Sequence, residues 1–299
     1  MRIFVTGGTG FIGRSVVAEL IARKHEVLVL TERSEHVEGV SVLQGTLTHV
    51  EPWEDSLKRF APEAVIHLAW EGIPDFSYTQ CSKNLQYGIN LLNVIAGTDC
   101  ARIVATGTGF ECGTLVGKID DDVMVPPFTP FTAAKHALHL LGIELAKEKK
   151  IDFVWLRPYN PYGGGQRSGS LIPYIMRTVA EGVPLQLKNP IAQGDFIYIA
   201  DVARVFVDAV EKGKGIATYN VGSGYLTPVR EIARLVCEIM GKGGAYYDNF
   251  KETAQGDLQN AAYADLTKVK RDLGWQPLVS IKEGLQKTIT DYENTNHRV

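Results

Sequence analysis

One glycine-rich stretch near the N-terminus limits the possible folds of this chain more than any other feature. It reads T-G-G-T-G-F-I-G from Thr6 to Gly13, follows the apolar residues 3–5 and precedes a helical pattern of apolar residues over 16–21. A strand, a glycine turn and a helix in this order allow a tight bend and close approach of a pyrophosphate to the backbone. The diphosphate then rests on the N–H groups that open the helix. The stretch therefore predicts a dinucleotide site rather than an ordinary glycine turn.

Short apolar runs and helical patterns alternate after this turn. Apolar runs at residues 26–30, 42–45, 64–69 and 101–105 are separated by helix-length segments, and no internal repeat interrupts them. This alternation indicates βαβ units and a parallel sheet covered by helices on both faces. The expected fold class is α/β with a doubly wound (Rossmann) parallel sheet.

Composition and charge bound the classes of protein that the chain can represent. Its 299 residues, 45% of them hydrophobic and 22% charged, are ordinary for a globular protein with an ample core. A net charge of −3 argues against a nucleic-acid partner, and the lack of a membrane-spanning run or signal peptide favours a cytoplasmic protein with no membrane partner. The cysteines have no C-x-x-C spacing, and the acidic run 120–122 is interpreted as solvated loop charge, so we expect no metal site.

The end of the second predicted strand bears on which dinucleotide is bound. An acidic residue about 20 positions beyond the glycines accepts the ribose hydroxyls of NAD, whereas an arginine there accommodates the 2′-phosphate of NADP. Thr31 stands where the acid is expected, and Arg33 follows closely. Glu32 leaves NAD open, because its carboxylate could take the hydroxyls while Arg33 is merely a loop charge. The pattern favours NADP over NAD.

Further motifs follow in a fixed order across nearly the whole chain. They are H-L-A at 67–69, a strand end at Thr108, a helix start over 131–135, R-P-Y-N-P-Y-G at 157–163, D-F-I-Y-I-A-D-V-A at 195–203 and L-G-W-Q-P at 273–277. With the glycine turn, this order resembles the extended short-chain dehydrogenase/reductases, the group of nucleotide-sugar epimerases, dehydratases and reductases. The resemblance implies a Rossmann cofactor domain over 1–162 and 195–224, a smaller substrate-binding domain over 163–194 and 225–299, and a homodimer formed through helices that include the one after Lys135.

The family's chemistry is hydride transfer between nicotinamide and a sugar carbon. A Tyr acts as general acid/base, a Lys four residues later lowers the Tyr pKa and binds the nicotinamide ribose, and a Ser or Thr polarises the substrate oxygen. Thr108 and Lys135 match two of these roles, but Phe131 stands at the tyrosine position and can transfer no proton. Three explanations stay open: a deliberate Tyr→Phe change, another donor such as Tyr78, Tyr159, Tyr162 or a water, or loss of turnover.

The resemblance also implies binding residues at matching positions. The cofactor-binding set is Gly7, Thr9, Gly10, Phe11, Ile12, Gly13, Thr31, Arg33, Leu47, Leu68, Ala69, Lys135 and Tyr159. The substrate-binding set is Trp70, Thr108, Gly109, Asn160 and Leu171, with Asn160 equally explained as a turn residue before proline. Structural roles are expected for His67 (strand packing), Arg157 (a link), Asp195 and Asp201 (loop anchors and helix cap) and Trp275 (core).

Two departures from the family concern the nucleotide diphosphate. Related enzymes usually carry Arg before the D-F-x-Y-V segment and another Arg before a late G-D, where this chain has Gly194 and Ala254. Arginine makes the bidentate phosphate contacts best, so their loss weakens the nucleotide-sugar assignment. Arg167, Lys188 and Lys251 either replace them or are surface charges.

The residues after Thr108 help to separate the possible reactions. Family dehydratases place an Asp-Glu pair there, whereas this chain has Gly109 and Phe110, which disfavours dehydration. The NADP preference favours a reductase of a 4-keto-(6-deoxy)sugar, because NADPH is normally consumed and exchanged, whereas a 4-epimerase more often retains NAD. A catalytically silent NADP-binding sensor or scaffold is the alternative of another class, favoured by Phe131, Gly194 and Ala254.

Overall fold

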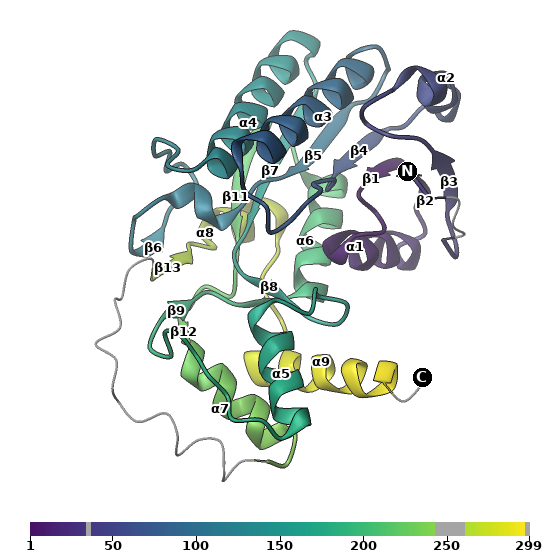
Figure 1. Cartoon of the computed structure of the whole chain (residues 1–299). Helices are drawn as coiled ribbons and strands as arrows, with labels where there is room; N and C mark the ends of the chain where they lie inside the picture. Colours follow the sequence, from purple (N-terminus) through teal and green to yellow (C-terminus); the bar gives the residue numbers. More distant parts are fainter. Residues whose placement is uncertain (34–36, 243–260, 297–299) are drawn as a thin grey trace.

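A sheet of seven parallel strands lies at the centre of the computed structural model, which describes residues 1–33, 37–242 and 261–296 (Figure 1). The strand order is β11-β7-β5-β4-β1-β2-β3. The strands are β1 (Arg2–Thr6), β2 (Glu26–Thr31), β3 (Ser41–Gln44), β4 (Ala64–His67), β5 (Arg102–Thr106), β7 (Asp152–Pro158) and β11 (Ile216–Val221). The strand order reverses at β1 and β4, and ligands of such sheets bind beyond the carboxyl ends of the strands at this point. The expected fold class is confirmed.

Side chains that alternate along each strand divide the core between the two faces of the sheet. Ile3 and Val5 of β1 pack on the face covered by α1 (Phe11–Ala22) and α6 (Ile199–Lys212). Phe4, between them, packs on the opposite face with residues of α2 (Glu51–Phe60), α3 (Tyr78–Ala96) and α4 (Pro130–Lys149). Because both faces are buried, the strands are apolar throughout, as parallel strands generally are.

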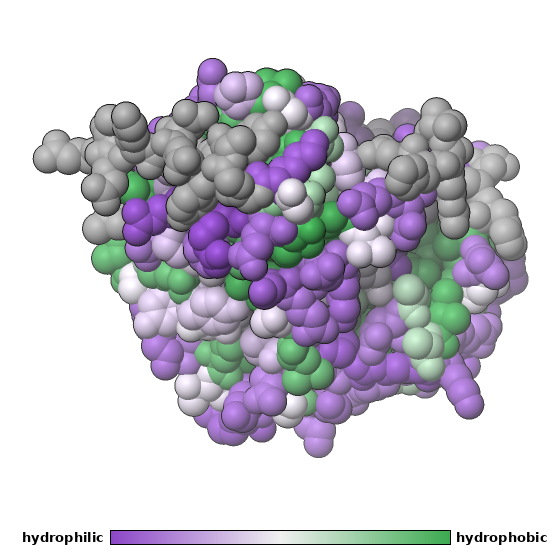
Figure 2. Space-filling view, turned by 90° about the horizontal axis from the view of Figure 1, so that it is seen from below, coloured by the Kyte–Doolittle hydropathy of each residue, from purple (hydrophilic) through white to green (hydrophobic). Residues whose placement is uncertain are grey.

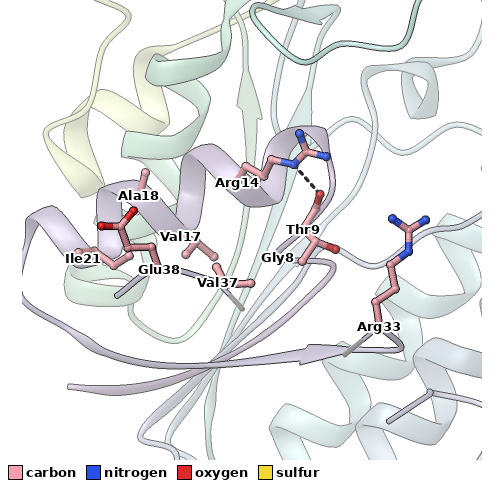
Figure 3. A pocket seen from close by; sticks show the side chains of 9 residues that line it. All are labelled: Gly8, Thr9, Arg14, Val17, Ala18, Ile21, Arg33, Val37 and Glu38. Carbon is pink, nitrogen blue, oxygen red and sulfur yellow. Dashed lines mark hydrogen bonds between the residues drawn. The ribbon is translucent and has the colours of Figure 1, made fainter. Parts of the chain in front are cut away.

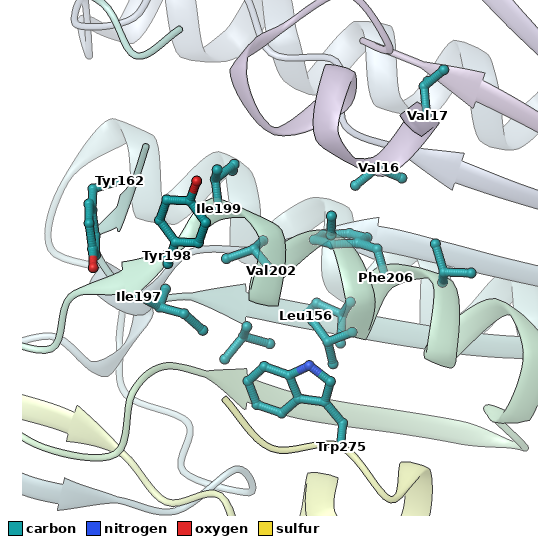
Figure 4. Packing of buried hydrophobic residues seen from close by; sticks show 14 of the residues in the cluster. Val16, Val17, Leu156, Tyr162, Ile197, Tyr198, Ile199, Val202, Phe206 and Trp275 are labelled. Atoms are coloured by element: carbon teal, nitrogen blue, oxygen red, sulfur yellow. The ribbon is translucent and has the colours of Figure 1, made fainter. Parts of the chain in front are cut away.

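Later helices extend the first of these cores. Below the sheet lie α5 (Leu171–Glu181), α7 (Val229–Ile239) and α9 (Ile281–Asn296), whereas α8 (Thr267–Leu273) packs against α6 and β11 (Figure 1). In Figure 4, Phe206 of α6 lies with Val16 of α1 on one side and Trp275 on the other. Hydrophilic residues make up most of the face seen from below, because apolar residues of α5, α7 and α9 are turned into the core (Figure 2).

Short strand pairs connect the segments outside the main sheet. They are β8 (Pro161–Tyr162) with β10 (Ile197–Tyr198), β9 (Gln193–Gly194) with β12 (Thr227–Pro228), and β6 (Gly117–Ile119) with β13 (Ala262–Ala264). The last pair and the contact of α8 with α6 bring part of the region after residue 225 against the sheet. The exact two-domain division therefore stays a prediction.

Buried polar side chains fix the loops between these elements. The Asp195 carboxylate accepts hydrogen bonds from the backbone N–H groups of Ser223 and Ala264, and the Asp201 carboxylate accepts two from the segment after Trp275. Loop anchoring is thus confirmed for both aspartates, but neither caps α6, which begins at Ile199 with Tyr198 as its N-cap.

Two other residues with expected structural roles can be placed. Trp275 is buried in the core, as expected, and its indole N–H donates to the Asp201 carbonyl. The interpretation of Asp121 as solvated charge was wrong, because its buried carboxylate accepts the Asn220 N–H.

Within the described residues, no helix is long and apolar enough to cross a membrane.

Candidate active site

The glycine turn forms a cradle between β1 and α1. Gly7 has a positive φ of 72°, and a Cβ there would lie 2.6 Å from the backbone nitrogen of Ala69. A Cβ on Gly13 would collide with the carbonyl oxygen of Gly7, so only glycine lets α1 approach the turn this closely. Gly10 is the N-cap of α1 and no side chain caps it. The first N–H groups of α1, in the turn of Phe11 and Ile12, therefore suit a cofactor diphosphate.

A pocket of about 380 Å³ opens beside this cradle at the end of β2 (Figure 3). Gly8 and Thr9 line it together with two arginines, Arg14 of α1 and Arg33. Arg14 Nε donates to the Thr9 carbonyl at 2.8 Å. Figure 3 shows both guanidinium groups near Thr9, whereas the Glu38 carboxylate lies at the other end of the pocket, near Ala18 and Ile21. The arginine end of the pocket is therefore suited to an anion.

The remaining expected cofactor residues follow the carboxyl ends of other strands. Leu47 follows β3, Leu68 and Ala69 follow β4, and Tyr159 follows β7. Thr31 ends β2 with its hydroxyl accepting the Arg33 N–H at 3.2 Å, so it is held by the backbone of the residue beside it. The parallel sheet thus gathers these positions along one edge, which is where a dinucleotide lies in this architecture.

The start of α4 positions Phe131 and Lys135. Thr129 is the N-cap and accepts the Thr132 N–H at 3.2 Å, while Pro130 occupies the first turn, where its missing N–H costs nothing. Phe131 and Lys135 follow four residues apart on one face of the helix. Both are buried, and both contact Trp70.

An aromatic group surrounds the position where a catalytic tyrosine was expected. The Phe131 ring lies edge-on to Trp70, with centroids 5.2 Å apart, and 4.6 Å from the centroid of Phe76. Lys135 Nζ lies 4.2 Å from the Trp70 ring centroid and donates to the Thr106 carbonyl at 2.7 Å. Within the described part of the chain, the buried indole N–H of Trp70 has no hydrogen-bond acceptor. A bound molecule with an oxygen at this point would supply one.

Thr108 is held by a buried polar network. It caps the short helix η1 (Gly109–Cys112), and its hydroxyl oxygen accepts the Phe110 N–H at 3.3 Å. The Glu111 carboxylate accepts the Thr108 N–H at 2.8 Å and the Arg157 Nε–H at 2.9 Å. It also accepts the Trp155 indole N–H. The structural role expected for Arg157 is confirmed, and Glu111 fixes the backbone at Thr108.

Burial sets the protonation of the groups near Lys135. Desolvation lowers the pKa of Lys135 to about 8, opposed by the charge of Glu111. Desolvation, and then the Lys135 charge, lower the pKa of His67 to about 3, so this imidazole is neutral at pH 7. His67 is buried with Nδ1 2.8 Å from the Thr6 hydroxyl, which confirms it as a packed strand residue.

The expected substrate residues are more dispersed. Gly109 approaches the Tyr159 ring so closely that a Cβ would lie 2.9 Å from it. Asn160 is exposed, and its amide donates to the Asp195 carbonyl at 3.0 Å. Leu171 is the first residue of α5. Gly109 and Asn160 follow the carboxyl ends of β5 and β7, whereas Leu171 opens α5. Among the described residues, no hydrogen bond or ring contact joins Asn160 or Leu171 to Phe131, Lys135 or Trp70.

Of the two positions where related enzymes usually carry arginine, the structure describes Gly194. A Cβ on the buried Gly194 would lie 3.0 Å from the Asn160 amide nitrogen and 3.0 Å from the Phe196 ring, so a side chain there would require these two side chains to shift. Arg167 and Lys188 are exposed. Ala254 and Lys251 lie outside the described residues.

Comparison with known proteins identifies the family. A family model described as the NAD dependent epimerase/dehydratase family matches residues 3–222. The chain belongs to this family. The matched region contains the glycine turn, Thr108 and the start of α4, and membership confirms the resemblance inferred from the motif order.

Relatives within the NAD dependent epimerase/dehydratase family carry out different reactions. The dTDP-4-dehydro-6-deoxyglucose reductase of Escherichia coli is 25% identical, with 96% of each chain covered. The UDP-glucose 4-epimerase of Thermotoga maritima, solved with UDP-glucose, has a TM-score of 0.87 at 26% identity, covering 99% of this chain and 100% of that one. The UDP-glucose 4-epimerase of Thermus thermophilus, solved with NAD, has a TM-score of 0.79 at 26% identity, covering 98% and 99%. Membership alone therefore does not select the reaction.

Sequence reasoning missed three residues of this site. Arg14 directly follows the last glycine, and that adjacency was the one available signal. Glu111 pairs with Arg157, 46 positions away, and Phe76 reaches Phe131 from a loop before α3. Contacts at such sequence separations leave no local pattern.

Proposed function

We propose that the chain is an NADPH-dependent reductase of a nucleotide-activated 4-keto-(6-deoxy)sugar. The observation that carries the proposal is the pair of arginines, Arg14 and Arg33, which line one end of the pocket together with Thr9. The Arg33 N–H donates to the Thr31 hydroxyl, so Thr31 lies beside this end of the pocket. Guanidinium groups suit a 2′-phosphate, and a threonine in place of an acid does not repel one. The similarity to the E. coli reductase over 96% of both chains supports the sugar substrate.

The residues of the site suit carbonyl reduction. The nicotinamide cofactor supplies a hydride when bound. The Thr108 hydroxyl already accepts the Phe110 N–H, and its own proton is free to be donated to a substrate oxygen. The Lys135 ammonium adds positive charge near the oxygen as negative charge develops, and the Trp70 indole N–H offers a further donor. The rings of Phe131 and Phe76 pack against each other beside this point.

The cofactor preference is tested by measuring NADPH and NADH affinity from the quenching of protein fluorescence. An arginine contact with a phosphate contributes about 1.5–3 kcal/mol, so Arg33→Ala should weaken NADPH binding about 10- to 100-fold and leave NADH unchanged. The control is Arg271→Ala, which removes an exposed arginine on α8, at the opposite edge of the sheet. Equal loss for both cofactors, or none for either, would contradict the NADP assignment.

The reaction is tested by following NADPH oxidation with a panel of nucleotide 4-keto-6-deoxysugars. The chain and its Phe131→Tyr variant are compared, because tyrosine restores the usual acid at this position. Stoichiometric NADPH consumption with formation of the 4-hydroxy product supports the reductase. Tight NADPH binding with no turnover by either protein would overturn it.

A 4-epimerase is the second candidate, favoured by the TM-score of 0.87 with the T. maritima UDP-glucose 4-epimerase. An epimerase oxidises and re-reduces the same carbon, so product forms without net consumption of cofactor. Incubation with UDP-glucose and catalytic NAD, followed by chromatography of the sugars, separates this outcome from reduction.

A catalytically silent NADP-binding protein is the third candidate, favoured by the packed phenyl ring of Phe131. It predicts NADPH binding without product from any sugar in the panel, even after Phe131→Tyr. Turnover of a single sugar by the unchanged chain would exclude it.

We also propose a homodimer formed through α3 and α4. These helices pack side by side, and Leu140 and Leu141 of α4 expose 43% and 45% of their surface. Light scattering coupled to gel filtration should give twice the chain mass of 32.9 kDa, and Leu141→Glu should give the single mass. A monomer for the unchanged chain would contradict the proposal.

A further inference from the structure

The three tyrosines considered as proton donors differ in exposure and in the contacts of their hydroxyls. Tyr78 exposes 77% of its surface at the start of α3. The Tyr162 hydroxyl donates to the Ile281 carbonyl at 3.3 Å. Tyr159 is buried beside Cys112, and burial raises the pKa of its phenol well above 10. The Tyr162 phenol is therefore already hydrogen-bonded, and the raised pKa makes Tyr159 a weaker acid than an ordinary tyrosine.

Lys135 is a proton-bearing group beside that position in the described structure. It lies one turn after Phe131, and both side chains contact the same indole, Trp70. Its Nζ donates to the carbonyl of Thr106, two residues before Thr108. The side chain is only 5% exposed, so its ammonium is separated from bulk water and directed at the strand end that presents the Thr108 hydroxyl.

The charges around Lys135 leave it able to exchange a proton. Glu111, on η1, is the nearest acid, but its carboxylate is paired with Arg157 of β7 at 2.9 Å. His67 of β4 and His139, one turn further along α4, each have a pKa lowered to about 3, mainly by burial, so both are neutral. With these neighbours, burial dominates and lowers the pKa of Lys135 to about 8. A general acid works best with a pKa near the working pH.

We propose that Lys135 itself, in place of a tyrosine, delivers the proton in this chain's reductive reaction, directly or through one water beside Phe131. The inference rests on the proposed reductase function. The carbonyl carbon gains a hydride from reduced nicotinamide, which is oxidised to the nicotinamidium form. The carbonyl oxygen takes a proton from the Lys135 ammonium, so one O–H bond forms and one N–H bond breaks. The neutral amine then regains a proton from water.

Variants at position 135 separate charge from acidity. Lys135→Arg keeps a positive donor whose pKa is too high to release a proton, so the turnover rate should fall about 100- to 10,000-fold. Phe131→Tyr should restore part of the turnover of Lys135→Arg by supplying a phenol. The control is Lys147→Arg, an exposed lysine on the same helix.

The pH profile gives a second readout. Because the ammonium form is the acid, reductive turnover of the unchanged chain should fall as the pH rises through about 8. In the chain with Phe131→Tyr, the fall in turnover should occur instead at the pKa of the new phenol. The proposal would be overturned if turnover is unchanged in Lys135→Arg, or if the pH profile of turnover is unchanged in Phe131→Tyr.

A measurement without substrate completes the test. In protein labelled with carbon-13 at lysine Cε, the resonance missing from Lys135→Met is that of Lys135, and its titration midpoint should lie near pH 8. A midpoint above 10 would overturn the proposal. If Phe131→Tyr reduces the sugars and the unchanged chain does not, the reductase function stands and the role of Lys135 falls. If no variant reduces any sugar, the reductase function falls first.

Discussion

The buried pair of Glu111 and Arg157 offers a sharp test of what holds the strand ends at the candidate active site in place. Their side chains are 3% and 5% exposed and lie 2.9 Å apart. Removing one partner of a buried ion pair leaves the other uncompensated and typically costs about 3–5 kcal/mol. Glu111→Leu should therefore lower the free energy of unfolding by about 4 kcal/mol, because it also strips an acceptor from the Trp155 indole and the Thr108 N–H.

A double-mutant cycle measured by urea denaturation isolates the pair. Arg157→Met alone should cost about 3 kcal/mol, whereas Glu111→Leu combined with Arg157→Met should cost at least about 2 kcal/mol less than the sum of the single changes. The exposed pair of Lys147 and Glu144 is the control, and Lys147→Met should change stability by less than about 0.5 kcal/mol. Additive losses, or single losses below about 1 kcal/mol, would refute the assignment of this pair as the anchor.

Three further outcomes follow from the geometry. Gly13→Ala should abolish cofactor binding measured by calorimetry, because the new Cβ would collide with the Gly7 carbonyl oxygen. The control, Gly169→Ala, should leave binding unchanged, because a Cβ there meets no atom within 4 Å. Between pH 7 and 9, the free energy of unfolding of the unchanged chain should rise by about 1.4 kcal/mol relative to that of Lys135→Met. The reason is that Lys135 loses its proton near pH 8 in the folded chain but keeps it up to about 10.5 in the unfolded chain. A constant difference in urea denaturation at the two pH values would contradict the lowered pKa. Trp275→Ala should cost about 3–5 kcal/mol in the same assay, because the indole is fully buried, and a loss below about 1 kcal/mol would show that the site collapses around the change.

Much of the fold could be predicted because its signals are local. The glycine turn, the apolar runs and the helix start over 131–135 each depend on residues within a few positions, and the parallel sheet follows from their alternation. The placement of Thr108 and Lys135 near each other follows from the same rule, because both come after the carboxyl ends of strands or open the next helix.

What could not be predicted depends on contacts between distant residues. Asp121 was taken for a surface charge because its neighbours in sequence are acidic, yet Asn220, 99 positions away, binds it in the interior. Similarly, Gly194 was seen as a lost arginine, although the crowding by Asn160 and Phe196 becomes visible only after folding. The ring contacts of Phe131 with Trp70 and Phe76 join residues 61 and 55 positions apart, which no periodic pattern connects.

The strand order has a consequence for how the sheet is assembled during synthesis. Of the seven strands, β1 is translated first and occupies an interior position, with two strands on one side and four on the other. Next, β2 and β3 extend one side, and β4, β5, β7 and β11 then extend the other in the order of translation. Every new strand meets an exposed edge, and none has to be inserted between strands that are already paired. The nascent chain can therefore grow its sheet outward from β1 as it leaves the ribosome, without breaking a hydrogen-bonded ladder that has already formed.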